Sequence, residues 1–321
     1  MPTPKAPAGL KTATRAPTGR SRLPDHLYAY LFIVPVLLFI LLLVVYPIYY
    51  SVNISLYDIN ITFGSWKFVG LAQYAKAVLD PAVHHALLIT AVYTVFVTVF
   101  SMAIGVGGAL LLNEKFPGRG LLLGIVILPW SLSTYATAVI WRFLYSAEVG
   151  MFNALLRDLG LTHQAIDFLS ARTALLAAAV AHSWQLAPLG MYFMLATLGV
   201  VPDDLYKLAK LDKLGAWGRF WHVTFPYLKL PFLIQMVLVT GEAARTFDLI
   251  FFLTGGGPGN ATRGLSQEIY VETFQNLNLG YGAAQSWILV LFILVITTAY
   301  FFLLFGRKRR ESKGQLEGGR A

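Results

Sequence analysis

Six separate runs of mostly apolar residues constrain this chain more than any other feature of its sequence. Each is more than 20 residues long, and they lie at about Leu27–Tyr50, Ala86–Leu112, Leu121–Tyr145, Ala174–Val200, Leu228–Leu253 and Ala284–Phe305. A helix needs roughly 20 apolar residues to cross the hydrocarbon core of a bilayer. The sequence therefore predicts an all-α integral membrane protein with six transmembrane helices.

The composition agrees with a membrane protein and excludes several other classes. Hydrophobic residues make up 57% of the chain and charged residues 13%, whereas soluble domains carry roughly 25% charged residues. The net charge of +9 does not indicate a nucleic-acid partner, because the basic residues lie in short blocks between apolar runs. The chain has no cysteine, and its six histidines show no metal-ligand spacing, so we expect no metal site.

The distribution of Lys and Arg predicts the orientation. If the N-terminus is cytoplasmic, the segments 1–26, 113–120, 201–229 and 306–321 share one side and hold 18 of the 25 basic residues. Because cytoplasmic loops carry the excess of Lys and Arg, we expect both termini in the cytoplasm of a bacterial or archaeal cell. Basic tails at 1–26 and 307–321, both expected to lack fixed structure, flank a transmembrane domain at 27–306.

Small residues predict one packing face. Ser101, Gly105 and Ala109 recur every fourth residue along the second apolar run. Such a stripe allows a second helix to approach closely in a membrane. We expect a helix–helix contact here rather than a ligand site.

The loop 201–227, between the fourth and fifth helices, has a distinctive polar pattern. Pro202, Asp203 and Asp204 are typical of a helix start, and Gly215 of a helix end. Between them, leucine and lysine each recur every third residue, at Leu205, Leu208 and Leu211 and at Lys207, Lys210 and Lys213. One interpretation is an interfacial helix with snorkelling lysines. The other is a helix whose apolar face docks into a groove of a soluble partner.

A second short helix is expected over Ala216–Val223, with Pro226 at the entry to the fifth transmembrane helix. Measured back from Pro226, the loop resembles the characteristic cytoplasmic loop of permease subunits in binding-protein-dependent ABC importers. That pattern reads, in order, Glu-Ala-Ala, any three residues, Gly, any nine residues, Ile, any one residue and Leu-Pro. Ala209 and Pro226 match it, whereas Lys207 replaces the Glu and Lys213 the Gly.

Other motifs of the same family lie on either side of the loop. They are Phe68–Tyr74, Pro117–Gly120, Ile127–Trp130, Trp141–Tyr145, Phe247–Thr262 and Leu279–Ala284. The resemblance covers about residues 28–306 and points to the carbohydrate-uptake branch. It implies the type I ABC importer permease fold, in the subunit type that pairs with a second, different permease.

The resemblance also implies partners. The ATPase-coupling residues would be Tyr206, Lys207, Leu208, Ala209, Asp212, Lys213, Gly215 and Pro226. The chain has no phosphate-binding Gly-rich motif ending in Gly-Lys-Ser/Thr, so ATP and Mg would be bound by two partner ATPase subunits, and the chain itself would be non-catalytic and free of cofactors. An extracytoplasmic solute-binding protein would dock on the loops Ser146–Arg172 and Gly255–Tyr281.

Polar residues inside the apolar runs are candidates for the substrate pathway, since such groups are costly in a membrane unless functional or paired. The candidates are Trp130, Thr134, His182, Trp184, Gln185, Glu242, Arg245 and Asp248. The last three are expected on one side of a continuous fifth helix. The other interpretation is structural, with an ion-pair ladder in that helix and interhelical hydrogen bonds elsewhere.

Two other function classes stay open at this point. A secondary transporter or channel for a small polar solute would need no ATPase, and an integral membrane enzyme would need a reactive cluster for which the sequence gives little sign. The solute is also open, because disaccharides, polyols, glycerol phosphodiesters and anionic sugars all fit a pathway with hydroxyl-binding side chains.

Overall fold

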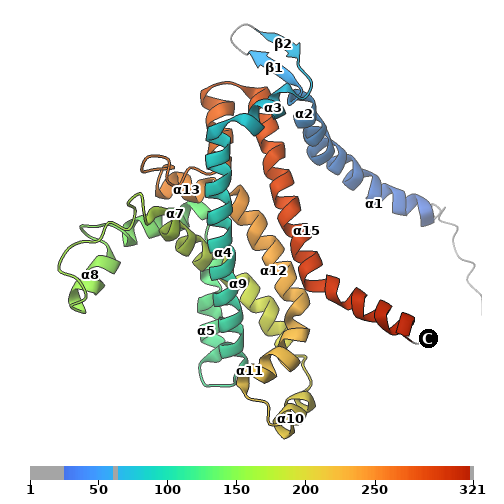
Figure 1. Ribbon diagram of the computed structural model, residues 1–321, viewed down its shortest axis with the longest axis vertical. Coiled ribbons are helices and arrows are strands. Elements are labelled where there is room, and N and C mark those ends of the chain that lie inside the picture. Colours follow the sequence, from blue (N-terminus) through green and yellow to red (C-terminus); the bar gives the residue numbers. More distant parts are fainter. Residues whose placement is uncertain (1–24, 61–63, 319–321) are drawn as a thin grey trace, which may run out of the picture. The chain divides into compact units, whose positions relative to one another are not determined.

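The computed structural model describes residues 25–60 and 64–318, which fall into two compact units divided between Ser51 and Val52. The described part of the first unit is helical (Figure 1). It comprises α1 (Asp25–Ile40), the π turn η1 (Leu41–Val45) and most of α2 (Tyr46–Ile54). The stretch Tyr30–Ile54 is long and apolar enough to cross a membrane, as predicted.

A small hairpin opens the second unit, where the sequence suggested no strand. Strand β1 (Tyr57–Asn60) pairs with antiparallel β2 (Ser65–Phe68), and Tyr57 lies opposite Phe68. Their rings meet edge to face with centroids 5.3 Å apart, a cross-strand contact that stabilises the pair. Helix α3 (Ala72–Leu79) follows.

Four long helices form the body of the second unit, namely α4 (Pro81–Asn113), α9 (Ala174–Leu198), α12 (Phe225–Arg245) and α15 (Leu279–Gly318) (Figure 1). Helix α4 packs along α9 and α12. The predicted small-residue stripe is confirmed as a packing face, because Ser101, Gly105 and Ala109 are all buried. A Cβ at Gly105 would lie 3.5 Å from the carbonyl oxygen of Ala187 on α9.

The third predicted span is broken, so the expectation of one continuous helix over Leu121–Tyr145 was wrong. It consists of α5 (Arg119–Val126), α6 (Leu128–Ser131) and α7 (Thr134–Leu144), with a 102° bend before α7. Leu132 and Ser133 are extended, and Ser133 Oγ accepts a hydrogen bond from the Ala136 N–H at 3.2 Å. This N-cap starts a new helix where the run of hydrophobicity suggested continuation.

The fifth predicted span also has different ends. Helices α11 (Ala216–Arg219) and α12 are joined through the π turn η2 (Phe220–Thr224) into one stretch, so the separate second loop helix was wrong. The π turn carries the helix past Pro226, which has no N–H to donate. At the other end Thr246 is extended and terminates α12, and α13 (Asp248–Leu253) is a separate helix.

The remaining elements are α8 (Met151–Asp158), α10 (Asp203–Leu211), α14 (Leu265–Tyr270) and the π turn η3 (Val271–Gln275). Helix α15 continues to Gly318, so the expectation of an unstructured tail from 307 was wrong for this part. The predictions for residues 1–24 and 319–321 lie outside the described residues.

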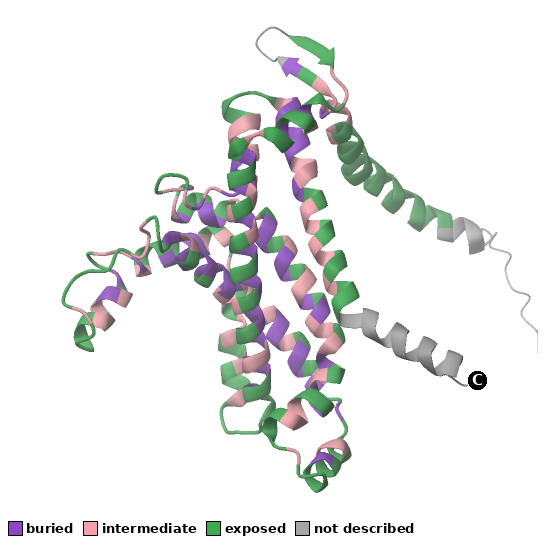
Figure 2. Ribbon diagram, viewed as in Figure 1, coloured by how far each residue is buried: buried purple, intermediate pink, exposed green. Residues whose placement is uncertain are grey.

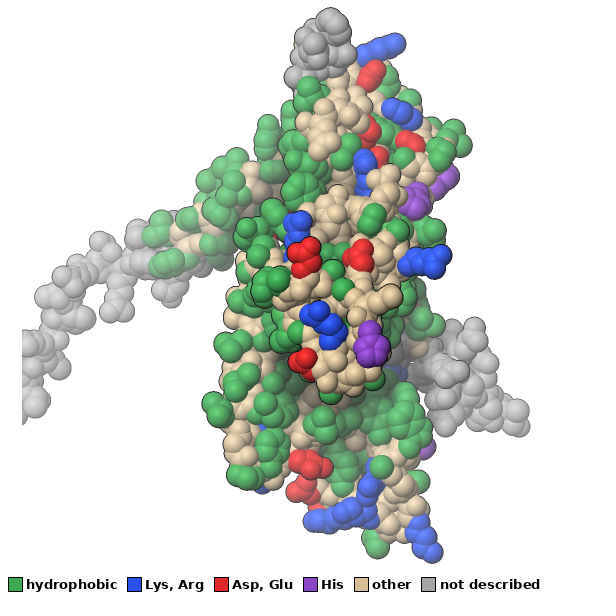
Figure 3. Space-filling model, turned by 90° about the vertical axis from the view of Figure 1, so that its left-hand side faces the viewer, with side chains coloured by type: hydrophobic (Ala, Val, Ile, Leu, Met, Phe, Trp, Pro, Cys, Tyr) green, Lys and Arg blue, Asp and Glu red, His purple; other side chains and the backbone are tan. Residues whose placement is uncertain are grey.

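Burial follows the helix contacts (Figure 2). One core cluster contains Tyr93, Val97, Ala181 and Val239, from α4, α9 and α12. Large apolar side chains elsewhere on the long helices are exposed, such as Leu291 on α15. Figure 3 shows hydrophobic side chains over much of the face in view, with charged groups at both ends and in a patch midway along it. The described residues contain five continuous candidate spans and the bent pair as a sixth, and their exposed apolar surfaces suit contact with lipid or with a partner subunit.

Candidate functional site

Helix α10 has a well-defined beginning and end. Asp203 and Asp204 lie in its first turn after the N-cap Pro202, as predicted. It ends in a Schellman motif, with the Leu214 N–H bonded to the Ala209 carbonyl and the Lys213 N–H to that of Lys210, both at 3.0 Å. Gly215 was expected as the residue that terminates the helix, and this was wrong, because Lys213 takes that role two residues earlier.

Lys213 itself adopts the left-handed conformation of this motif, with φ 55°. Glycine has no Cβ and takes this conformation without steric cost. This explains physically why the pattern of the resembled loop has Gly at the position that Lys213 occupies.

The inward side of α10 packs on the chain's own helices. Ala209 is buried in a cluster with Val201 and Val223. The Tyr206 hydroxyl lies 3.2 Å from Thr224 Oγ1 of η2. These contacts fix α10 against the start of the fifth span.

The outward side of α10 is apolar and basic. Leu208 and Leu211 are 56% and 78% exposed, whereas Leu205 is half-buried. The spacing by threes predicts that the three leucines share one face of the helix, and this prediction was wrong. Residues spaced by three drift by about 60° per step on a helix with 3.6 residues per turn. Lys207 Nζ lies 2.7 Å from Asp204 Oδ1 at the surface, and Lys210 is exposed. The remaining coupling candidates Asp212, Gly215 and Pro226 are exposed too.

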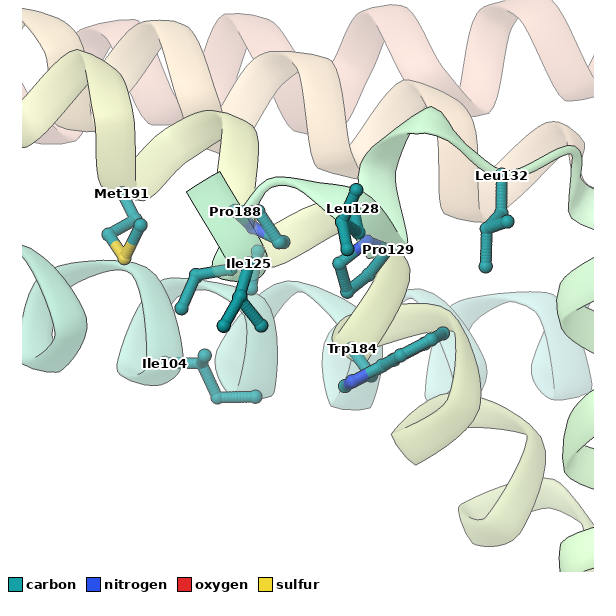
Figure 4. Close-up of a pocket in the computed structure, with 10 residues that line it drawn as sticks. Ile104, Ile125, Leu128, Pro129, Leu132, Trp184, Pro188 and Met191 are labelled. Atoms are coloured by element: carbon teal, nitrogen blue, oxygen red, sulfur yellow. The ribbon is translucent and has the colours of Figure 1, made fainter. Parts of the chain in front are cut away.

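The bend in the third span borders an apolar cavity of about 470 Å³. Figure 4 shows Ile104 of α4, Leu128 and Pro129 of α6, and Trp184 and Pro188 of α9 around it. Trp184 supplies the lining's only polar side-chain group, the indole N–H. This cavity therefore cannot satisfy the hydroxyl groups of a sugar.

Three other candidates from this region differ in exposure. Trp130 on α6 is 46% exposed. Gln185 is buried, and its Nε2 donates to the Leu132 carbonyl at 2.8 Å, beside the bend. Thr134 is half-buried as the first residue of α7.

His182 is enclosed between α4 and α9. It is 3% exposed, and its Nδ1 lies 2.9 Å from the Tyr93 hydroxyl. The adjacent Ser183 hydroxyl donates to the Ala179 carbonyl on the same helix. Tyr93 was not among the candidates predicted from the sequence, although its polar neighbours Thr90 and Thr94 mark one face of an otherwise apolar run.

The charged candidates are exposed. Glu242 and Arg245 form an ion pair along α12, with side chains 47% and 63% exposed. Asp248 is exposed at the start of α13, where a carboxylate favours the helix dipole. Because α12 ends at Arg245, the expectation of all three on one side of a continuous helix was wrong.

A polar link joins the start of α4 to α15. Asp80 caps α4, accepting from the Ala82 N–H at 2.8 Å, and its other oxygen accepts from the Tyr281 hydroxyl at 2.6 Å. Lys76 Nζ lies 4.1 Å from the centroid of the Tyr281 ring. The Tyr281 hydrogen bond is the main cause that lowers the pKa of Asp80 below its ordinary value.

These features define a helical membrane-spanning protein with a structured loop at one end. Residues 100–310 match the family described as binding-protein-dependent transport system inner membrane component. The trehalose/maltose permease MalF of Thermococcus litoralis is 32% identical over 92% of this chain and 98% of its own length. The glycerol-3-phosphate permease UgpA of Agrobacterium fabrum is 28% identical over 87% and 94%.

A solved structure shares the fold. It is that of a bacterial ABC transporter involved in alginate import, with a TM-score of 0.73 and 19% identity over 87% of this chain and 95% of that chain. The chain belongs to the binding-protein-dependent ABC importer permease family, and it is a transmembrane subunit of an importer. The fold predicted from the sequence, the type I permease fold, is confirmed.

Proposed function

We propose that this permease subunit imports a sugar or sugar derivative and is driven by separate ATPase subunits that bind the loop 201–227. The observation that carries the proposal is the outward side of α10, where Leu208 and Leu211 stand exposed beside basic side chains. An apolar stripe on a helix that is fixed from behind suits a groove in a soluble partner.

The substrate class rests on the relatives. Similar permeases are named for trehalose/maltose, sulfoquinovosyl glycerol and sn-glycerol-3-phosphate transport. Each of these solutes carries more than one hydroxyl group, and two of the names indicate an anionic group as well. A carbohydrate or glycerol derivative is therefore the substrate that we propose for this chain.

The assembly that we propose contains a second, different permease, two ATPase subunits that bind ATP and Mg, and an extracytoplasmic solute-binding protein. A related fold is known in complex with an alginate-bound periplasmic protein. On this chain the corresponding docking loops would be 146–172 and 255–281. Both termini would be cytoplasmic, in accord with the bias of Lys and Arg.

The exposed polar candidates would line the substrate pathway. Glu242, Arg245 and Asp248 offer charged partners for hydroxyl or anionic groups, and Trp130 offers an aromatic face. The other proposed residues, Thr134, His182, Trp184 and Gln185, are half-buried or buried and would support the pathway walls.

Charge reversal on α10 tests the coupling. We expect the double substitution Lys207→Glu and Lys210→Glu to reduce ATPase co-purification and ATP-dependent uptake into proteoliposomes, because a basic surface needs acidic partners. Lys115→Glu, at an exposed lysine in the loop 113–120, is the matched control and should leave both unchanged. Unchanged co-purification and uptake in the α10 variant would refute the coupling role.

The substrate class has a separate test. Uptake of labelled maltose, trehalose and glycerol-3-phosphate by the reconstituted importer should be ATP-dependent for at least one solute of this class. Uptake of amino acids alone would contradict the carbohydrate assignment without affecting the coupling result.

A further inference from the structure

A second apolar cavity, of about 640 Å³, lies beside the first turns of α9, at the end of that helix remote from α10. Side chains from the end of α7, from α8 and from α9 line it. Its volume is in the range of sites that hold small ligands. The lining determines which chemical class of ligand fits.

The polar groups in the lining are almost all hydrogen-bonded within the protein, so they offer almost no hydrogen bonds to a polar ligand. The Tyr145 hydroxyl donates to the Ala177 carbonyl at 2.9 Å, and Thr173 Oγ1 donates to the Phe168 carbonyl at 2.9 Å. Among the side chains that line the cavity, the indole N–H of Trp141 is the one buried polar group without a hydrogen-bond partner in the described part of the chain. A hydroxylated solute would lose its hydrogen bonds to water here, so the ligand must be apolar, with at most an acceptor group.

Aromatic rings form one wall of the cavity. Trp141 and Tyr145 have centroids 5.3 Å apart, Tyr145 and Phe168 5.4 Å, and Phe152 and Phe168 6.1 Å. This cluster lies where the spans of α7 and α9 end. Aromatic side chains gather at that level of a membrane, between acyl chains and headgroups.

The cavity is continuous with the exposed apolar surface of a membrane-spanning helix. Leu176 and Val180 line it from the membrane-spanning α9 and are 42% and 37% exposed. Leu155 lines it from α8 and is 51% exposed. Met151 and Leu159 are exposed four residues before and after Leu155, so they extend the apolar face of α8 beyond the cavity. An amphipathic helix of this kind lies in the membrane interface.

Asn153 holds α8 in this position. Its side chain is fully buried and bonded on both sides, with Nδ2 donating to the carbonyls of Ser146 and Ile166 at 3.2 and 3.0 Å. Its Oδ1 accepts from the Ile166 N–H at 2.8 Å. The amide thus joins both ends of the loop, and the cavity is formed before any ligand binds.

We propose that this cavity binds an acyl chain of a membrane phospholipid, with α8 lying in the membrane surface. The proposal goes beyond the transport function and does not depend on the substrate or on coupling at α10. It assigns the two sides of α8 in the loop 146–172 to different contacts. The apolar face of α8 is then covered by lipid, and its polar side is free for a solute-binding protein.

Lipid retention in the assembled importer tests this proposal. Native mass spectrometry after purification in mild detergent should detect bound phospholipid, and Leu176→Trp, which fills the cavity, should remove one lipid per importer. Leu88→Trp is the matched control, since Leu88 is 60% exposed on α4 away from the cavity, and it should keep that lipid. Equal lipid counts in both variants would overturn the proposal.

Photo-cross-linking gives a second measurement that does not require the Trp variant to fold. A benzophenone amino acid at Leu155 in the solubilised importer should form an adduct with the mass of a phospholipid. An adduct with the second permease or with the solute-binding protein, or no adduct at all, would overturn the acyl-chain assignment.

Discussion

The contact between Gly190 of α9 and Gln235 of α12 leaves no space for a methyl group. A Cβ built at position 190 lies 2.5 Å from Cγ and Cδ of Gln235. Gln235 is 1% exposed, and its Nε2 reaches the Leu186 carbonyl at 3.4 Å. Pro188 has no N–H and so interrupts the hydrogen bonding of α9 next to that carbonyl. The Gln235 side chain, from the neighbouring α12, supplies a donor to the α9 backbone there.

Gly190→Ala should therefore destabilise the packed helices. Overpacking of a filled core costs about 1–3 kcal/mol, and loss of the Gln235 hydrogen bond adds about 1 kcal/mol. The helix preference of Ala over Gly returns about 1 kcal/mol, so the net loss is about 1–3 kcal/mol. Gly241→Ala on α12 is the matched control, because no heavy atom lies within 4 Å of a Cβ there. It should raise stability by up to about 1 kcal/mol.

Thermal unfolding of the detergent-purified importer measures both variants. The double variant Gly190→Ala with Gln235→Ala should regain much of the loss, with a coupling of about 0.5–3 kcal/mol. Two results would refute the reasoning. One is an equal rise in stability for Gly190→Ala and Gly241→Ala, and the other is an unchanged cost of Gly190→Ala in the Gln235→Ala background.

Three further predictions concern other contacts. Lys213→Gly should stabilise the end of α10 by about 1 kcal/mol, because glycine adopts the left-handed φ of 55° at this position without steric cost. Lys210→Gly, inside the helix, should destabilise α10 by about 1 kcal/mol. Amide exchange of α10 measures both changes. The folded-state pKa of Asp80 is lowered, so the stability that its carboxylate contributes is present above the unfolded pKa of about 3.9 and is lost as pH falls through the folded pKa. Asp80→Asn keeps an N-cap but has no carboxylate. The difference in melting temperature between the parent and Asp80→Asn should therefore be present at pH 7 and shrink below about pH 4. Tyr93→Phe should cost about 1–3 kcal/mol in thermal unfolding by leaving His182 Nδ1 without its partner, and a neutral result would remove the role of that hydrogen bond.

Sequence patterns were sufficient for the features set by long-range hydrophobicity. Run length identified the spans, and the spacing of Ser101, Gly105 and Ala109 identified the face of α4 that packs on α9. Both signals are averaged over many residues. They survive local irregularities, because the membrane requires apolar length whatever the detailed helix geometry.

The sequence was less informative where one or two residues decide the backbone. The break before α7 depends on Ser133 acting as an N-cap, and the end of α12 depends on an extended Thr246. Neither residue type forbids a helix, so tertiary packing makes the choice. The same limit applies to the candidate site, since the sequence could name His182 but could not identify Tyr93, 89 residues earlier, as its partner.

Two of the departures from the family pattern in and just after α10 have separate physical consequences. Lys213 is a conformational departure, because a side chain in the left-handed region costs roughly 1–2 kcal/mol. The two Schellman hydrogen bonds and the packing of Leu214 on the Ala209 cluster offset that cost within the loop. Lys207 is an electrostatic departure at the surface, paired with Asp204 in the same helix. Changes at Lys213 should therefore alter the stability of α10, whereas changes at Lys207 should alter its association with a partner and leave the loop's own fold intact.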